Sequence, residues 1–168
     1  MAYRNKTYVV FDADTDIQYY RTLQMWKANE SIDFDFYDAH DLNNLRDGSS
    51  EDTIKRKLRK RMANAKILVV LVGENTRYLY KYVRWEIEIA IAAEIPIVVT
   101  NINCKRIFDD DRCPAILDKE LALHISFKSK ILQQAFDSWP SNHKSNVEKG
   151  KSGPYYFKDS VYERLGLN

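Results

Sequence analysis

A run of apolar residues without polar alternation, "KILVVLVG" at 66–73, is the feature that most constrains the fold. Strands buried on both faces have such runs, whereas half-exposed strands alternate apolar and polar residues. Further strands are predicted by the apolar runs at 7–11 and 95–101, and "ALHISF" at 122–127 predicts a last, shorter strand. Because helical periodicities separate these runs, the chain is predicted to form a parallel sheet with helices on both faces.

The remaining segments complete this α/β pattern. Residues 32–38, "IDFDFYD", alternate and predict a strand near an edge of the sheet. The helix that holds Glu86 is expected to be capped by Asn75 or Thr76 and to end before Pro96, and another helix is expected at 129–139. Five strands and about five helices favour a flavodoxin-like, three-layer fold with a five-stranded parallel sheet.

Composition excludes several classes of function. The net charge of +2 gives no strong electrostatic reason to expect nucleic acid or an acidic membrane as partner. No signal-peptide pattern is present, and no apolar stretch approaches the about 20 residues of a membrane span, so a cytoplasmic location is expected. Cys104 and Cys113 are expected to be reduced. The three histidines lack zinc-ligand spacing, so no metal is expected.

A carboxylate lies on the apolar stripe of the helix that begins the stretch 79–99. The core-facing positions are occupied by Leu79, Val83, Ala90 and Ile91, and Glu86 falls among them. An unpaired buried carboxylate is costly. Glu86 is therefore expected to have a partner, to lie at the edge of the stripe, or to have a task.

Polar loops follow the first three predicted strands, where an open α/β sheet binds its ligands. None of them is a dinucleotide-binding glycine turn, a phosphate loop or a hydrolase nucleophile elbow. Asp12 and Asp14 fit either a solvated turn or a ligand-binding loop. The candidate binding residues of these loops are Phe11, Asp12, Asp14, Asp38, Arg46, Asp47 and Gly73.

The segments "VVFDADTDIQYYRTLQMW", "FDFYDAHDLNNLRDGSSEDTIKRKLRKRM" and "VLVGENTRYLYKYVRWEIEIAI" together resemble the TIR-like family of bacterial antiphage proteins, close to the TIR component of Thoeris defence systems. The resemblance covers residues 5–140, and 141–168 is expected to be a C-terminal extension packed on the same domain. "YVRWEI" aligns Glu86 with the family's catalytic glutamate, while Tyr82 stands where the family usually has Trp.

The resemblance implies that the chain cleaves the nicotinamide–ribose bond of NAD, with NAD as substrate and no separate cofactor. Glu86 would be catalytic, and Tyr82 and the loop residues named above would bind NAD. The product would be a cyclic or conjugated ADP-ribose messenger that activates a separate effector protein. TIR–TIR contacts would form a homo-oligomer.

Two other functions remain open at this stage. A catalytically silent TIR-like scaffold would act only through assembly. A phosphoacceptor receiver domain shares the fold, and Asp12, Thr100 and Lys128 suit it, but Gly73 and Glu74 stand where the phosphorylated aspartate should end the third strand. The run "KRKLRKR" is predicted to form a solvated helix face.

Overall fold

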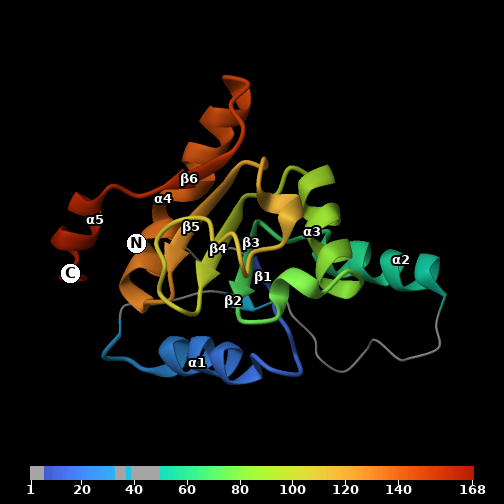
Figure 1. Ribbon diagram of the computed structural model, residues 1–168, viewed down its shortest axis with the longest axis horizontal. Coiled ribbons are helices and arrows are strands. Elements are labelled where there is room, and N and C mark those ends of the chain that lie inside the picture. The colour runs from blue at the N-terminus through green and yellow to red at the C-terminus, as the bar shows by residue number, and fades with distance from the viewer. Residues whose placement is uncertain (1–5, 33–36, 39–49) are drawn as a thin grey trace.

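The computed structural model describes residues 6–32, 37–38 and 50–168 of the chain. Strands and helices alternate along most of this part (Figure 1). The elements in chain order, with η for short 3₁₀ helices, are β1 (Lys6–Val10), α1 (Ile17–Ala28), β2 (Tyr37–Asp38), α2 (Glu51–Met62), β3 (Ile67–Val72), η1 (Thr76–Tyr78), α3 (Tyr82–Ala92), β4 (Ile97–Asn101), η2 (Ala115–Leu117), β5 (Ala122–Ser126), α4 (Ser129–Glu148), β6 (Pro154–Tyr156) and α5 (Asp159–Arg164).

The strands form one parallel sheet in the order β2-β1-β3-β4-β5-β6. The first five follow the flavodoxin-like order, which confirms the predicted fold class. The short strand β6 comes from the C-terminal segment and extends the sheet beyond β5.

Strand β3 is the centre of the sheet and explains the apolar run in the sequence. All six of its residues are buried with 0% exposure. Val69 in the middle of β3 pairs with Val9 of β1 on one side and with Val98 of β4 on the other. With strands on both edges and helices over both faces, no position of β3 meets water.

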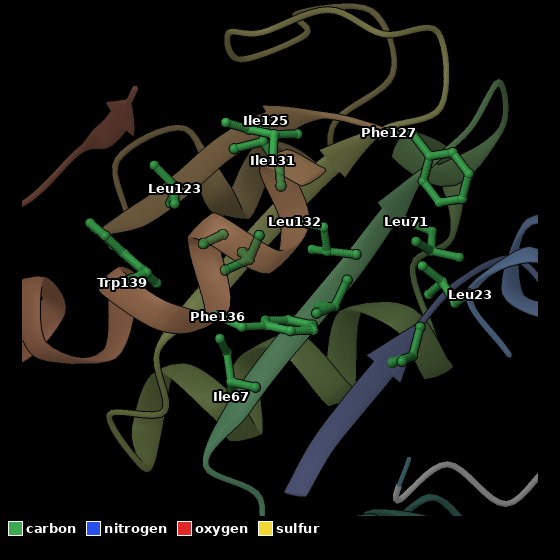
Figure 2. Packing of buried hydrophobic residues seen from close by; sticks show 14 of the residues in the cluster. Leu23, Ile67, Leu71, Leu123, Ile125, Phe127, Ile131, Leu132, Phe136 and Trp139 are labelled. Atoms are coloured by element: carbon green, nitrogen blue, oxygen red, sulfur yellow. The ribbon is translucent and has the colours of Figure 1, made fainter. Parts of the chain in front are cut away.

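Two apolar clusters hold the helices on the sheet. Helices α1 and α4 cover one face, where Leu132 and Phe136 of α4 belong to one cluster with Ile67 and Leu71 of β3 (Figure 2). Helices α2 and α3 cover the other face (Figure 1). There Met62 of α2 and Ile87 of α3 pack in one cluster with apolar residues of β1, β3 and β4.

The helix that carries Glu86 begins later than the sequence predicts. Thr76 does not cap it: its hydroxyl accepts a hydrogen bond from the Gly73 amide at 2.8 Å, closing the turn after β3. Residues Thr76–Tyr78 form η1, and α3 begins only at Tyr82. The buried turn therefore uses the hydroxyl that was expected to cap the helix.

Helix α4 is longer than the predicted helix at 129–139, because it continues through Pro140 to Glu148. Proline removes one backbone hydrogen bond from a helix interior. Trp139, His143 and Asn146 nevertheless continue a buried face at helical spacing. Packing of this face offsets the cost of the proline, and α4 runs across the predicted domain boundary at residue 140.

Candidate active site

Glu86 lies on the sheet-facing side of α3, one turn into the helix. Val83, Ile87 and Ala90 on the same side are buried. Of the other predicted stripe residues, Leu79 precedes the helix, and both Leu79 and Ile91 are half-buried. Glu86 is only 5% exposed, so it does not lie at the edge of the stripe. Of the three expectations for this carboxylate, a buried position with partners describes the structure.

The first partner of Glu86 is Tyr8 of β1. The Tyr8 hydroxyl donates a hydrogen bond to Glu86 Oε1 at 3.4 Å. Tyr8 is buried with 0% exposure and belongs to the apolar cluster between the sheet, α2 and α3. The middle of a strand, and not a loop after a strand, thus supplies the contact with the carboxylate.

The second partner is Arg61, in the last turn of α2. Its side chain hydrogen-bonds the Tyr8 hydroxyl, and its charge acts on both Tyr8 and Glu86. Glu86 and Tyr8 are buried and Arg61 is half-buried; the three are referred to below as the buried triad. Its members come from α3, β1 and α2, so the packing of these elements brings the three groups together.

Burial dominates the electrostatics of the buried triad. It raises the pKa of Glu86 to about 8, while the hydrogen bond from Tyr8 and the charge of Arg61 lower this pKa. Burial and the neighbouring Glu86 raise the pKa of Tyr8, so the phenol keeps its proton at neutral pH. Proton exchange at Glu86 consequently falls within the physiological range.

The loop after β1 contains Phe11, Asp12 and Asp14. Phe11 is buried and stacks on Tyr20 of α1, with ring centroids 4.8 Å apart. Asp12 is also buried; its carboxylate accepts hydrogen bonds from the Asp14 amide at 3.0 Å and the Thr15 hydroxyl at 2.7 Å. Asp14 is exposed. Asp12 therefore builds this turn, and Phe11 contributes to the core.

Gly73, after β3, lies against Asp16 of the β1–α1 loop. A Cβ atom on Gly73 would collide with Asp16 Oδ2, so the carboxylate occupies the space that any other residue would need. Burial and the charge of Asp12 raise the pKa of Asp16, and Arg112 opposes them. Among the described residues, Asp16 Oδ2 has no hydrogen-bond partner. The two strand-end loops thus meet around a buried carboxyl group.

Tyr82 is the first residue of α3 and is half-buried. Its ring meets Trp85 edge-on, with centroids 5.6 Å apart, and the Lys55 ammonium lies 5.1 Å from the Trp85 ring centroid. Trp85 therefore packs α3 against α2 through its contact with Lys55.

Three predicted site residues fall in or beside the part of the chain that is not described. Asp38 ends β2, where its backbone pairs with Thr7 of β1, but its side chain lies outside the described residues. Arg46 and Asp47 also lie outside the described residues. Their assignment to a nucleotide site, like that of the other loop residues, stays a prediction.

The residues that the sequence interpretation missed are Tyr8 and Arg61. Arg61 was included in the solvated face of "KRKLRKR", although it lies seven residues after Ile54, a core residue of α2. Seven residues complete two helical turns, so Arg61 belongs next to the apolar stripe. The seven-residue spacing from Ile54 could therefore have predicted that Arg61 lies near the buried side of α2, where it can face Glu86.

A family model described as "Thoeris protein ThsB, TIR-like domain" matches residues 8–106, more than half of the chain. The chain belongs to this family. The match begins at Tyr8 and includes Arg61 and Glu86, so the buried triad lies within the family's TIR-like domain. The resemblance found in the sequence is confirmed: the chain is a TIR-type protein of Thoeris antiphage defence.

None of the helices in the described part of the chain combines the length and the apolar character that crossing a bilayer requires.

Proposed function

We propose that this TIR-like domain cleaves the bond between nicotinamide and ribose in NAD, with Glu86 as the catalytic carboxylate. One observation carries the proposal: the glutamate aligned with the family's catalytic position is buried, and burial raises its pKa to about 8. A buried acid with a strongly shifted pKa is typical of a functional group. Family membership supports the same assignment.

The chemistry follows from the charge that develops during cleavage. When neutral nicotinamide leaves, its bond to C1′ breaks heterolytically and the ribose becomes oxocarbenium-like. A carboxylate close to the ribose opposes this positive charge, and it does so more strongly in the transition state than in the ground state. The low dielectric around Glu86 strengthens that interaction.

The acceptor of the ribosyl cation determines the product. In the proposed reaction, a nucleophile within the same molecule or a small co-substrate attacks C1′ and gives cyclic or conjugated ADP-ribose. Attack by water would give ADP-ribose. We propose the cyclic or conjugated product as the messenger that activates a separate effector protein, because membership of a Thoeris family implies a defence system with further components.

Access to Glu86 connects this activity to assembly. At 5% exposure, the Glu86 carboxylate offers little surface to a ribose, so NAD reaches it only after neighbouring groups move. If TIR–TIR contacts favour the open arrangement, association raises activity without changing a catalytic residue. We therefore propose that a homo-oligomer is the active form.

Purified full-length protein incubated with NAD tests the activity. We expect nicotinamide release by the wild type, measured by liquid chromatography and mass spectrometry, and at least a hundredfold slower release by Glu86→Gln, in the range typical of lost electrostatic catalysis. Glu88→Gln is the matched control, because Glu88 lies on the same helix and pairs with Arg84 at 2.8 Å on the exposed side.

Three outcomes separate the alternatives. Full NAD turnover by Glu86→Gln would refute the catalytic assignment. No turnover by folded wild type at any protein concentration, with intact assembly in light scattering, would indicate a silent scaffold. Specific activity that stays constant on dilution of a monomer would refute the assembly requirement and leave Glu86 as catalyst.

A further inference from the structure

We propose that Tyr8 and Arg61 are positioning residues that fix the orientation of the Glu86 carboxyl group and favour its charged form within the apolar cluster. The inference concerns the three described groups of the buried triad, and it rests on the proposed function only where it calls Glu86 a catalyst. It adds to the proposed site two residues that lie away from the strand-end loops.

The direction of the hydrogen bonds supports this role. An arginine side chain can only donate, so the Tyr8 oxygen accepts from Arg61 and the phenol proton remains for Glu86 Oε1, 3.4 Å away. An ionised carboxylate can only accept. Arg61 donates to Tyr8, and Tyr8 donates to Glu86, so this chain of hydrogen bonds ends at an acceptor. An ionised Glu86 is such an acceptor, whereas a protonated Glu86 would add a donor that this chain does not need.

Among the described residues around Glu86, Tyr8 and Arg61 are the groups that can orient its carboxyl group and favour its charged form. On α3 itself, Val83, Ile87 and Ala90 are the neighbouring buried residues. Strand β3 contributes apolar residues to the same cluster. Of the described residues, Arg61 on α2 is the charged group that acts on Glu86, and Tyr8 on β1 is the polar one.

Fold stability alone does not account for the triad. A buried carboxyl group loses its hydration, and apolar residues of similar volume are often as stabilising or more so. Tyr8 and Glu86 nevertheless lie among apolar residues at 0% and 5% exposure. A demand on the charge state and orientation of Glu86 explains why polar groups occupy these positions.

Tyr8→Phe and Arg61→Gln test the proposal. Tyr8→Phe removes one oxygen and keeps the ring, and Arg61→Gln removes the positive charge. Two matched controls are available. Arg59→Gln removes an exposed cation from the same helix, and Tyr162→Phe removes a buried hydroxyl that accepts from the Ser126 amide at 3.4 Å.

The measurement is a carbon-13 NMR titration of protein labelled at the glutamate side-chain carboxyl. The Glu86 signal is assigned by its absence from Glu86→Gln. We expect Glu86 in the wild type to titrate near pH 8, and both test variants to bind the proton roughly two- to tenfold more tightly, which moves the midpoint to higher pH. Both controls should keep the wild-type midpoint.

A midpoint in folded Tyr8→Phe equal to that of the wild type would overturn the proposal. If Arg61→Gln fails to fold, Tyr8→Phe decides alone, because it preserves nearly all the packing volume. The pH profile of NAD cleavage gives a second readout, and its acidic limb should move to higher pH in Tyr8→Phe. If the wild type does not cleave NAD, the proposed function fails, while the titration still decides the roles of Tyr8 and Arg61.

Discussion

At the scale of single residues, the chain places two opposite charges on two apolar helix faces. Glu86 belongs to the buried face of α3, and Arg61 is half-buried next to Met62 of α2. A charge on Glu86 would be costly alone, and the hydrogen bond from Tyr8 and the charge of Arg61 reduce that cost. Burial is still the largest effect on the pKa of Glu86, and it makes the stability of the folded protein depend on pH.

Glu86 should make the protein less stable as pH rises from about 4.5 to about 8. Its pKa is 4.5 when unperturbed and about 8 in the folded protein, so between these values the folded state binds more protons than the unfolded state. Glu86→Gln removes this dependence. We expect the variant to be more stable than the wild type at pH 8 by about a few kcal/mol, and the difference to shrink towards pH 5.

Urea unfolding of both proteins at pH 5 and pH 8 measures this difference. Titration of other groups, such as the buried His124, affects both proteins alike and cancels in the comparison. Glu88→Gln should follow the wild type at both pH values. Parallel pH dependence of wild type and Glu86→Gln would show that Glu86 is ionised normally in the folded protein.

At the scale of elements, the sequence predicts the strands better than the helix ends. The uninterrupted apolar run identifies β3, because a strand buried on both faces favours apolar residues at every position. The shorter runs of β4 and β5 were also recognised, although these strands include buried polar residues such as Thr100 and His124. The start of α3 and the continuation of α4 through Pro140 were missed. The Thr76 hydroxyl closes a local turn with the Gly73 amide, three residues away, and this turn competes with capping of the helix. The continuation of α4 depends on its buried face, a tertiary contact that local rules do not include.

In the candidate site, too, the sequence predicts the features that are local and misses those that depend on tertiary contacts. The stripe pattern correctly places Glu86 on a buried face, because helical periodicity is a local property. Its contact with Tyr8 joins residues that are 78 positions apart in the chain. This contact follows from the packing of α2 and α3 on β1, which the sequence does not show. The only signal in the sequence is that Arg61 lies near an apolar stripe of its helix, where a cation could face Glu86.

The contact between the β1–α1 and β3–η1 loops should be energetically coupled. The Cβ atom added by Gly73→Ala would collide with Asp16 Oδ2, and the buried carboxyl group must then move. We expect a loss of about 1–3 kcal/mol in unfolding free energy. Asp16→Ala makes room for the new methyl group, so the double variant should lose less than the sum of the two single variants by at least about 0.5 kcal/mol.

Chemical denaturation of the four proteins in this cycle gives the coupling energy. Asp14→Ala is the control in place of Asp16→Ala, because Asp14 is exposed. With that control, the effects should simply add. Additive effects of Gly73→Ala and Asp16→Ala would contradict the close approach of the two loops.

At the scale of the whole molecule, the C-terminal segment is part of the same folded unit as the sheet. Strand β6 pairs with β5, and Tyr162 of α5 is 1% exposed within the cluster on the α1 and α4 side. The Arg106 guanidinium lies 3.9 Å from the centre of the Tyr162 ring and donates to the Leu167 carbonyl at 2.6 Å. Residues far apart in the chain thus fix α5 beside the loop after β4.

Tyr162→Ala should therefore destabilise the whole domain and not only its C-terminal end. Removing a buried aromatic ring costs about 3–5 kcal/mol, and the guanidinium of Arg106 loses the ring on which it rests. Tyr80→Ala is the matched control, because Tyr80 is 66% exposed and its removal should cost little. Thermal unfolding followed by circular dichroism should show one transition for both variants, shifted to a clearly lower temperature in Tyr162→Ala alone. A main transition at the wild-type temperature in Tyr162→Ala, preceded by a small separate one, would mean that α5 unfolds independently of the sheet.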